Sequence, residues 1–331
     1  MMQSATKIPI SPTLLKTLVS NAFPRHRMTD FRELTDGYCN RVFHISLENH
    51  PAVILKAGPA KDCPMLTYEE NLIEREADML EWAAEKTKVP VPRVFFRDTS
   101  RTHLAGHYIF MEALEGVPYN TLKKGFYSRG IPSVEAELGR MLRELNNLHQ
   151  PEFGYPHAPK AAWSEAVEEM FLWLFDDADR FEISLPISRE EFRSLLEPLK
   201  PILDHVETAC FVHWDLWPGN VMVHPDPVRK KRWCVSGIFD FERVLWGDPL
   251  MEYNFGHEYH RSRLCKAYGR FRYFTKEEKI RRTLYDAYHL MVINVEDGPR
   301  QYGVPDFHKH FGGLLSRKLS RLEKLMQHSV S

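Results

Sequence analysis

The chain has 331 residues, and at roughly 150 residues per domain this length predicts two domains or lobes, which its 43% hydrophobic content allows to bury a large core. Its 44 lysines and arginines balance 45 aspartates and glutamates to a formal charge of −1, which excludes a global electrostatic attraction to nucleic acid or to an anionic membrane. The cysteines contain no C-x-x-C pair and no apolar run is as long as a membrane span or a signal peptide, so we expect a cytoplasmic protein without disulfides or structural zinc.

The N-terminal part of the sequence predicts mostly short strands. Ser11 and Pro12 have the pattern of a helix N-cap followed by a first-turn proline, and they predict a short amphipathic helix. Short apolar pieces broken by turn residues then predict three consecutive antiparallel strands, and two further strands follow the next helix. That helix begins at a capping box, Thr67–Glu70, and keeps helical spacing to about Lys86. The strand segments are 31–34, 41–47, 52–56, 94–96 and 108–111.

The rest of the chain predicts mainly helices. The turn at 115–118 separates the two parts, so we place an N-terminal nucleotide-binding lobe at residues 1–115 and a C-terminal catalytic and acceptor-binding lobe at 116–331. Helical periodicity, with further capping boxes at Ser188 and Thr275, predicts helices at 133–149, 163–180, 188–206, 275–295 and 307–325. Only 221–223 and 233–239 have the character of strands. The sequence therefore predicts an α+β fold.

Two stretches, 211–220 and 238–242, hold the residues that suggest chemistry. The first contains His213-x-Asp215-x-x-x-x-Asn220, and Asp240 ends an apolar strand in the second. Phosphoryl transfer requires positioned reactants, charge neutralised by magnesium, and a carboxylate that orients the attacking hydroxyl. Asp215 is then the candidate base, and Asn220 and Asp240 offer the oxygen ligands that Mg²⁺ prefers. The alternative is a turn in which Asp215 and Asn220 make only local backbone hydrogen bonds.

Lys56 and Glu76 add context to this motif. Lys56 closes an apolar strand, and Glu76 follows it inside the predicted helix. A nucleotide-dependent kinase needs a lysine for the phosphates and a glutamate that holds this lysine in place. Each residue alone has a simpler explanation, a solvated strand edge for Lys56 and a polar helix face for Glu76. These simpler explanations do not account for the order of Lys56 and Glu76 along the chain or for their separation from Asp215.

The sequence resembles the aminoglycoside phosphotransferase family, small-molecule kinases with the protein-kinase-like fold, from about Phe31 to Phe255. The resemblance is strongest in His213–Asn220 and in Ile238–Glu242 with the Gly-Asp-Pro turn that follows. Other segments are similar to the family's first strand–turn–strand, its approach to the fourth strand, its hinge, and the helix behind the catalytic loop: 34–43, 90–94, 111–116 and 138–149.

The resemblance implies a bilobal protein-kinase-like fold and a phosphotransferase with an alcohol group as acceptor. It implies ATP or GTP as phosphate donor and Mg²⁺ as metal, with Asp215 as base and with Asn220 and Asp240 as metal ligands. The residues implied in nucleotide binding are Gly37, Asn40, Lys56, Glu76, Glu112 and Leu114. The partner would be a small hydroxylated acceptor rather than nucleic acid or a membrane, and we expect a monomer or weak homodimer.

Three positions depart from the family pattern. Trp214 stands where the family usually has glycine, so its indole either lines the acceptor site or packs inward. Glu252 replaces the aspartate that is common after the Gly-Asp-Pro turn. The turn at Gly37 lacks the G-x-G-x-x-G run of protein kinases, so fewer backbone amides would contact the phosphates. None of these changes removes a residue expected to touch the reacting groups.

The acceptor itself is an open question at this point. Acidic residues in 163–181 would attract an aminoglycoside-like polycation if they faced the acceptor, or they form an ordinary solvated helix face. Aromatic residues would hold a quaternary ammonium, as in a choline or amino-alcohol kinase, or they pack in the core: Trp214, Trp217, Trp246, Tyr253 and Tyr259. An aminoglycoside-like or other hydroxylated metabolite is our first expectation. The alternatives are a choline, amino-alcohol or natural-product kinase and a non-catalytic nucleotide-binding protein.

Overall fold

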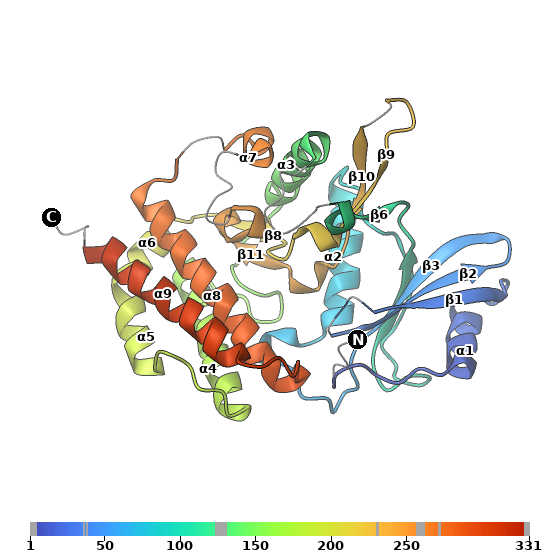
Figure 1. Ribbon diagram of the computed structural model, residues 1–331, viewed down its shortest axis with the longest axis horizontal. Coiled ribbons are helices and arrows are strands. Elements are labelled where there is room, and N and C mark those ends of the chain that lie inside the picture. Colours follow the sequence, from blue (N-terminus) through green and yellow to red (C-terminus); the bar gives the residue numbers. More distant parts are fainter. Residues whose placement is uncertain are drawn as a thin grey trace.

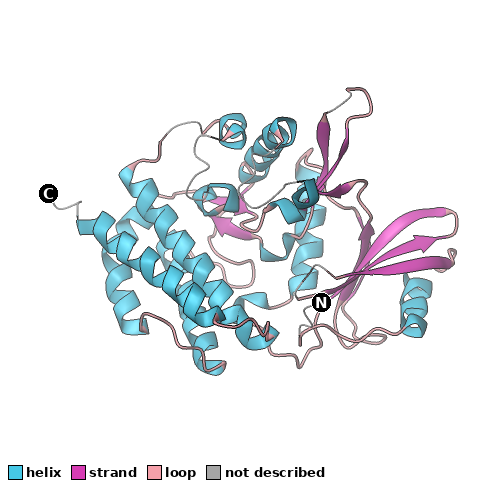
Figure 2. Cartoon of the chain, viewed as in Figure 1, coloured by secondary structure: helices cyan, strands magenta, loops and turns pink. Residues whose placement is uncertain are grey.

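The computed structural model describes residues 5–35, 37, 39–122, 131–229, 232–255, 262–270 and 273–327, and statements below refer to these. The strands of the N-terminal part gather at one end of the molecule and most of the helices lie at the other, and α2 (Leu72–Lys86) stands between them (Figures 1 and 2). The predicted α+β fold, with strands mainly in the N-terminal part and helices mainly in the C-terminal part, is therefore confirmed. No helix within the described ranges is long and apolar enough to cross a membrane.

The N-terminal sheet has five strands in the order β1-β2-β3-β5-β4, all paired antiparallel. Its strands are β1 (Met28–Leu34), β2 (Arg41–Leu47), β3 (His50–Ala57), β4 (Val94–Asp98) and β5 (Tyr108–Glu112). The three consecutive antiparallel strands expected from the sequence are β1, β2 and β3. The predicted helix α1 (Pro12–Ala22) is also present, with the Ser11 hydroxyl accepting the Leu14 amide at 3.1 Å. Its apolar face packs in one core with β2, β3 and β5.

Helix α2 begins later than the sequence predicts, at Leu72 instead of near Thr67. Residues 67–69 form a separate 3₁₀ turn, η1 (Thr67–Glu69). The reason is tertiary, because Thr67, the residue expected to cap the helix, has another partner. Its amide and hydroxyl both donate to Asp177 at 2.8 Å, and Glu70, the other residue of the predicted box, is exposed. The prediction of a capping box at Thr67–Glu70 was therefore wrong.

The C-terminal part is mainly helical, as predicted: α3 (Pro132–Asn146), α4 (Trp163–Arg180), α5 (Arg189–Leu196), α6 (Lys200–Asp204), α7 (Arg263–Tyr268), α8 (Lys276–Arg300) and α9 (Phe307–Gln327). The capping boxes expected at Ser188 and Thr275 are confirmed. The predicted helix at 188–206 is interrupted by the 3₁₀ turn η3 (Glu197–Leu199), where Pro198 and Pro201 cannot donate backbone hydrogen bonds. Helices α8 and α9 pack side by side (Figure 1).

Two small antiparallel sheets lie among these helices, ordered β10-β9-β6 and β11-β8-β7. The sequence predicts β9 (Val221–Pro225) and β10 (Trp233–Ile238) but misses the others: β6 (Val117–Pro118), β7 (His149–Gln150), β8 (Ala209–Val212) and β11 (Leu245–Gly247). All four residues of β8 are buried, so no alternation of polar and apolar residues marks it as a strand. The loop after β8 carries Asp215.

Helix α2 shares its main hydrophobic core with the C-terminal part. Its side chains Ile73, Ala77 and Leu80 belong to the same buried cluster as residues of α3, α4 and α8. Glu76, which lies on α2, is therefore held in place by the packing of this helix against both parts of the molecule.

Candidate active site

The loop after β8 places Asp215 beside Asn220. The Asn220 side-chain amide donates to the Asp215 carbonyl at 2.9 Å and lies 3.5 Å from Asp215 Oδ2. The Phe239 amide donates to the Asn220 carbonyl at 3.1 Å, so the residue after it, Asp240, is at the same place. The loop thus makes the local hydrogen bonds of the simpler alternative, and it also brings the three motif residues together.

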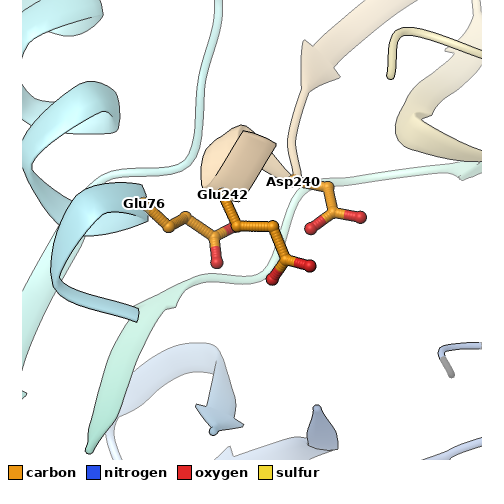
Figure 3. Close-up of side chains that lie close together, drawn as sticks. All are labelled: Glu76, Asp240 and Glu242. Atoms are coloured by element: carbon orange, nitrogen blue, oxygen red, sulfur yellow. The ribbon is translucent and has the colours of Figure 1, made fainter. Parts of the chain in front are cut away.

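Lys56 is the centre of a carboxylate cluster. Its Nζ lies 2.6 Å from Glu76 Oε2, 2.6 Å from Asp240 Oδ1 and 2.9 Å from Glu242 Oε2. Figure 3 shows the three acids, with Glu76 projecting from α2 toward Glu242 and with Asp240 beside them. One carboxylate oxygen from each of the three acids lies within 4.8 Å of the other two. The predicted pair of Lys56 and Glu76 is therefore present, and the solvated alternatives do not hold because both side chains are buried.

The charges in this cluster do not cancel, because one ammonium group faces three carboxylates. Burial raises the pKa of Glu76 to about 7. Burial also acts to raise the pKa of Asp240, but the Lys56 ammonium outweighs it and holds this pKa below its ordinary value. Oxygen ligands carrying excess negative charge are the donor set that suits a hard divalent cation. Glu242 belongs to this set, although we did not predict it as a site residue.

Of the two predicted nucleotide-binding residues before β2, one contacts the carboxylate cluster. The Asn40 side-chain amide donates to Glu242 Oε2 at 2.5 Å, so Asn40 contacts the cluster directly. Gly37 is exposed, and a Cβ placed on it would meet no atom within 4 Å. The structure therefore brings Asn40, but not Gly37, into contact with the carboxylates.

Glu112 and Leu114 lie where the N-terminal sheet joins the rest of the chain. Glu112 ends β5, and its side chain turns outward to accept the Arg93 amide at 3.3 Å. Leu114 packs against Gly237 of β10, where a Cβ would come within 2.6 Å of Leu114 Cδ1. Neither side chain belongs to the carboxylate cluster.

Glu252 supports the backbone of the loop. It accepts hydrogen bonds from the His213 amide at 2.9 Å, the Trp214 amide at 3.1 Å and the Asn146 side chain at 2.9 Å. Burial raises its pKa to about 7. The longer glutamate that replaces the family's usual aspartate therefore still has a supporting role, as its position suggested.

Trp214 packs inward and does not line an acceptor site. Its side chain is 1% exposed, and its indole N–H donates to the Arg243 carbonyl. The backbone has φ 40°, in the left-handed region that glycine adopts more easily. Its burial therefore excludes the hypothesis that the Trp214 indole lines the acceptor site.

Two further residues at the base were not predicted from sequence. Arg243 Nε lies 3.8 Å from Asp215 Oδ2, and the Arg243 guanidinium also pairs with Glu296 of α8. Burial raises the pKa of Asp215 to about 7, against the opposing effect of Arg243. Arg243 follows Asp240 closely in sequence, which was an available signal. Glu296 is far away in sequence, and only the packing of α8 brings it here.

The acidic residues of α4 are largely paired with cations. Glu168 lies 3.1 Å from Lys200, Glu169 lies 2.8 Å from Lys160, and Asp176 lies 2.7 Å from Arg189. These contacts match an ordinary ion-paired helix face. Among the aromatic candidates, Trp214 and Trp246 are buried, Trp217 and Tyr253 are partly exposed, and Tyr259 lies outside the described residues.

The fold is similar to that of several solved structures. Similar solved structures include a Thermobifida fusca protein assigned provisionally as a fructosamine-3-kinase (19% identity, 93% of this chain and 98% of that chain, TM-score 0.64) and a Ralstonia eutropha protein assigned provisionally as an aminoglycoside phosphotransferase (15%, 96% and 99%, TM-score 0.62). A third is the aminoglycoside phosphotransferase APH(4)-Ia in complex with AMP-PNP and hygromycin B (13%, 93% and 98%, TM-score 0.60). No curated protein matches the sequence significantly.

The identities are low, so these structures establish the fold. A family model decides membership, because it matches residues 30–273, well over half of the chain and further toward the C-terminus than we expected. The chain belongs to the phosphotransferase enzyme family.

Proposed function

We propose that this enzyme transfers the γ-phosphate of ATP or GTP to a hydroxyl group of a small molecule. The observation that supports it best is the meeting of Lys56, Glu76 and Asp240, from three separate elements, beside the loop that carries Asp215 and Asn220. A lysine held by a glutamate, next to a metal-binding aspartate and a carboxylate base, is the arrangement that phosphoryl transfer requires.

Asp215 would act as the base. The acceptor hydroxyl oxygen bonds to the γ-phosphorus while the bond from phosphorus to the bridging oxygen breaks. The electron pair of that bond leaves with the nucleoside diphosphate, and the hydroxyl proton passes to Asp215. Burial raises the pKa of Asp215 to about 7, which increases its affinity for this proton.

Asn220 and Asp240 would hold Mg²⁺, and Glu242 is a further candidate ligand. The fit rests on the donor set, because three carboxylates within 4.8 Å of one another are balanced by only one ammonium group. A bound Mg²⁺ would neutralise the negative charge of the phosphates. Lys56 would contact the phosphate oxygens, and Glu76 would hold Lys56 in place.

The remaining predicted residues would surround the nucleotide. Gly37 and Asn40, on the β1–β2 turn, would cover its phosphates, and the backbone of Glu112 and Leu114 would contact its base. We place the boundary between the lobes at Gly116, where φ is +104° and a Cβ would lie 2.1 Å from the Val223 carbonyl oxygen. A side chain there would be excluded both by the backbone conformation and by β9.

We propose a sugar-like hydroxylated acceptor, such as an aminoglycoside-like molecule. Two of the similar structures support this class of acceptor by their descriptions: one is provisionally assigned as a fructosamine-3-kinase, and the other is an aminoglycoside phosphotransferase in complex with hygromycin B. Because the acids of α4 are paired with cations, they do not favour polycationic sugar-like acceptors over neutral ones, and the proposal does not rest on them. A choline or amino-alcohol acceptor has less support, because Trp214 and Trp246 are buried and only Trp217 and Tyr253 of the described aromatic candidates are accessible.

The test measures nucleotide binding and phosphate transfer with Mg²⁺ over a panel of hydroxylated acceptors: aminoglycosides, glycated amines, sugars, choline and amino alcohols. We expect transfer to at least one acceptor, and we expect Asp215→Asn to reduce kcat by roughly 10²–10⁴-fold, as loss of a general base does, while nucleotide affinity is kept. Undiminished transfer in this variant would exclude Asp215 as base. Nucleotide binding without transfer to any acceptor would favour the non-catalytic alternative.

A further inference from the structure

We propose that Arg243 is a positioning residue that fixes the carboxylate of Asp215, and that Trp214 and Glu296 hold the Arg243 guanidinium in place. This inference rests on the proposed function, because it takes Asp215 as the base. It assigns a role to Trp214, which stands where glycine is usual, and to two residues that the sequence motif does not include.

The Arg243 side chain spans from the base to α8. Arg243 is the last residue of the 3₁₀ turn η5 (Phe241–Arg243), and this turn begins directly after Asp240. Its Nε lies 3.8 Å from Asp215 Oδ2, and the other end of its guanidinium pairs with Glu296. The Arg243 side chain is only 13% exposed. An arginine held between two carboxylates in a buried setting has a defined direction, because its donors are arranged in a rigid plane.

Trp214 fixes Arg243 at two points. The Arg243 guanidinium carbon lies 5.2 Å from the centre of the Trp214 ring, and the indole N–H donates to the Arg243 carbonyl. Side chain and backbone of Arg243 therefore both contact the same indole. Glycine could make neither contact, which gives a physical reason for a tryptophan at a backbone position with φ 40°.

Glu296 fixes the far end of the guanidinium and is itself held from both parts of the molecule. The Tyr68 hydroxyl donates to Glu296 at 2.9 Å, and Arg300 pairs with both Glu296 and Glu69. The result is an alternating series of charges from the base to the N-terminal part: Asp215, Arg243, Glu296, Arg300 and Glu69. Each charge has an opposite neighbour, so Arg243 is not a cation left over for a ligand.

The contacts at Asp215 are one-sided, and this is what makes positioning the role of Arg243. Arg243 Nε and Asn220 Nδ2 approach the same oxygen, Oδ2, at 3.8 and 3.5 Å. Contacts at Oδ2 would fix the orientation of the carboxylate and leave Oδ1 to take the proton of the acceptor hydroxyl. Misplacement of a catalytic group by about 1 Å can cost on the order of 100-fold in rate, so a residue that fixes the carboxylate affects kcat without touching substrate.

The test compares Arg243→Ala and Arg243→Lys with Arg189→Ala. Arg189 is a matched control, since it also lies between two carboxylates, Asp176 and Asp179, and against an aromatic ring, Phe175. Affinity for Mg·AMP-PNP is measured by calorimetry, and kcat and KM are measured with Mg·ATP and the best acceptor of the panel. We expect Arg243→Ala to lower kcat by about 10- to 100-fold while the affinity for Mg·AMP-PNP stays unchanged. We expect Arg189→Ala to have the kcat and the nucleotide affinity of the parent enzyme. Added guanidinium ion should restore part of the rate to Arg243→Ala and none to Asp215→Asn.

Two variants keep the proposal testable if Arg243→Ala does not fold. Glu296→Gln keeps the shape but removes a charge, and Trp214→Phe keeps a ring but removes the indole N–H. Both should lower kcat less than Arg243→Ala while leaving nucleotide affinity unchanged. Parent-like kcat in Arg243→Ala or Arg243→Lys, or a loss of nucleotide affinity that accounts for the lower rate, would overturn the positioning role.

A crystal structure of Arg243→Lys with Mg·AMP-PNP separates this proposal from the proposed function. We expect the Asp215 carboxylate to be rotated or in two conformations relative to the parent structure with the same ligand. An unmoved carboxylate would overturn the inference even if the enzyme is active. If the parent protein binds nucleotide but transfers no phosphate, the proposed function fails, and the structure still reports whether Arg243 positions Asp215.

Discussion

Glu242 shows, at the scale of single residues, how a short motif carries more than its recognised positions. The sequence analysis assigned a role to Asp240 but not to Glu242, two residues later. In the structure Glu242 accepts from Asn40 and pairs with Lys56, and its backbone carbonyl accepts the Arg75 side chain at 2.7 Å. The 3₁₀ turn after Asp240, which itself has φ 69°, brings both carboxylates to the same side.

Replacement of Glu242 tests whether this residue belongs to the metal site. We expect Glu242→Gln to weaken Mg-dependent nucleotide binding by about 10- to 100-fold, the usual loss when a ligand or its close partner is removed. Calorimetric titration of AMP-PNP with and without Mg²⁺ measures it. Glu190→Gln, an exposed glutamate on α5, is the control. An equal loss of affinity in the absence of Mg²⁺ would mean that Glu242 acts only through Lys56.

At the scale of elements, the start of α2 is decided by contacts outside the helix. Thr67 and Glu70 have a capping-box spacing, but Thr67 donates to Asp177 of α4 and Glu70 is exposed. Local sequence predicts the existence of the helix, because its apolar residues recur at helical spacing. It does not predict the first residue, because side-chain partners far away in sequence compete for the capping groups.

This competition has a measurable consequence for stability. Asp177→Ala leaves the Thr67 amide without its acceptor, and we expect a loss of about 2–3 kcal/mol in the free energy of unfolding. Thr67→Val removes one hydrogen bond and should cost about 1 kcal/mol. Urea denaturation measures both, and the effects should be less than additive in the double variant. Glu70→Ala should change stability little, whereas a true capping box would lose stability with it.

At the scale of the whole molecule, buried ion pairs join the N-terminal and C-terminal parts. Arg300, near the end of α8, pairs with Glu69 of η1 and with Glu296, and all three side chains are nearly inaccessible to solvent. Burial acts to raise the pKa of Glu296, but Arg243 and Arg300 outweigh it and lower this pKa to about 2. The carboxylate is therefore charged at neutral pH and needs its cations.

Removal of one partner tests the strength of this connection. We expect Arg300→Met to destabilise the protein by about 3–5 kcal/mol, because two carboxylates stay buried with fewer cations. Adding Glu69→Gln to this variant should recover part of the loss, since one of the two charges is then gone. Thermal and urea denaturation measure the free energies. A double variant no more stable than Arg300→Met would show that Glu69 carries little of the interaction.

The sequence by itself indicated the resemblance to a family, the fold class, the order of the main helices and strands, and the pairing of Lys56 with Glu76. The helices and strands follow from local spacing, whereas the family resemblance and the pairing of Lys56 with Glu76 follow from the order and separation of several motifs along the chain. Only the tertiary structure decided that Trp214 packs inward, that Arg243 and Glu296 reach the base, and that the acids of α4 are paired. Such facts depend on which distant elements pack together, and burial makes a polar side chain choose among partners that sequence spacing does not reveal.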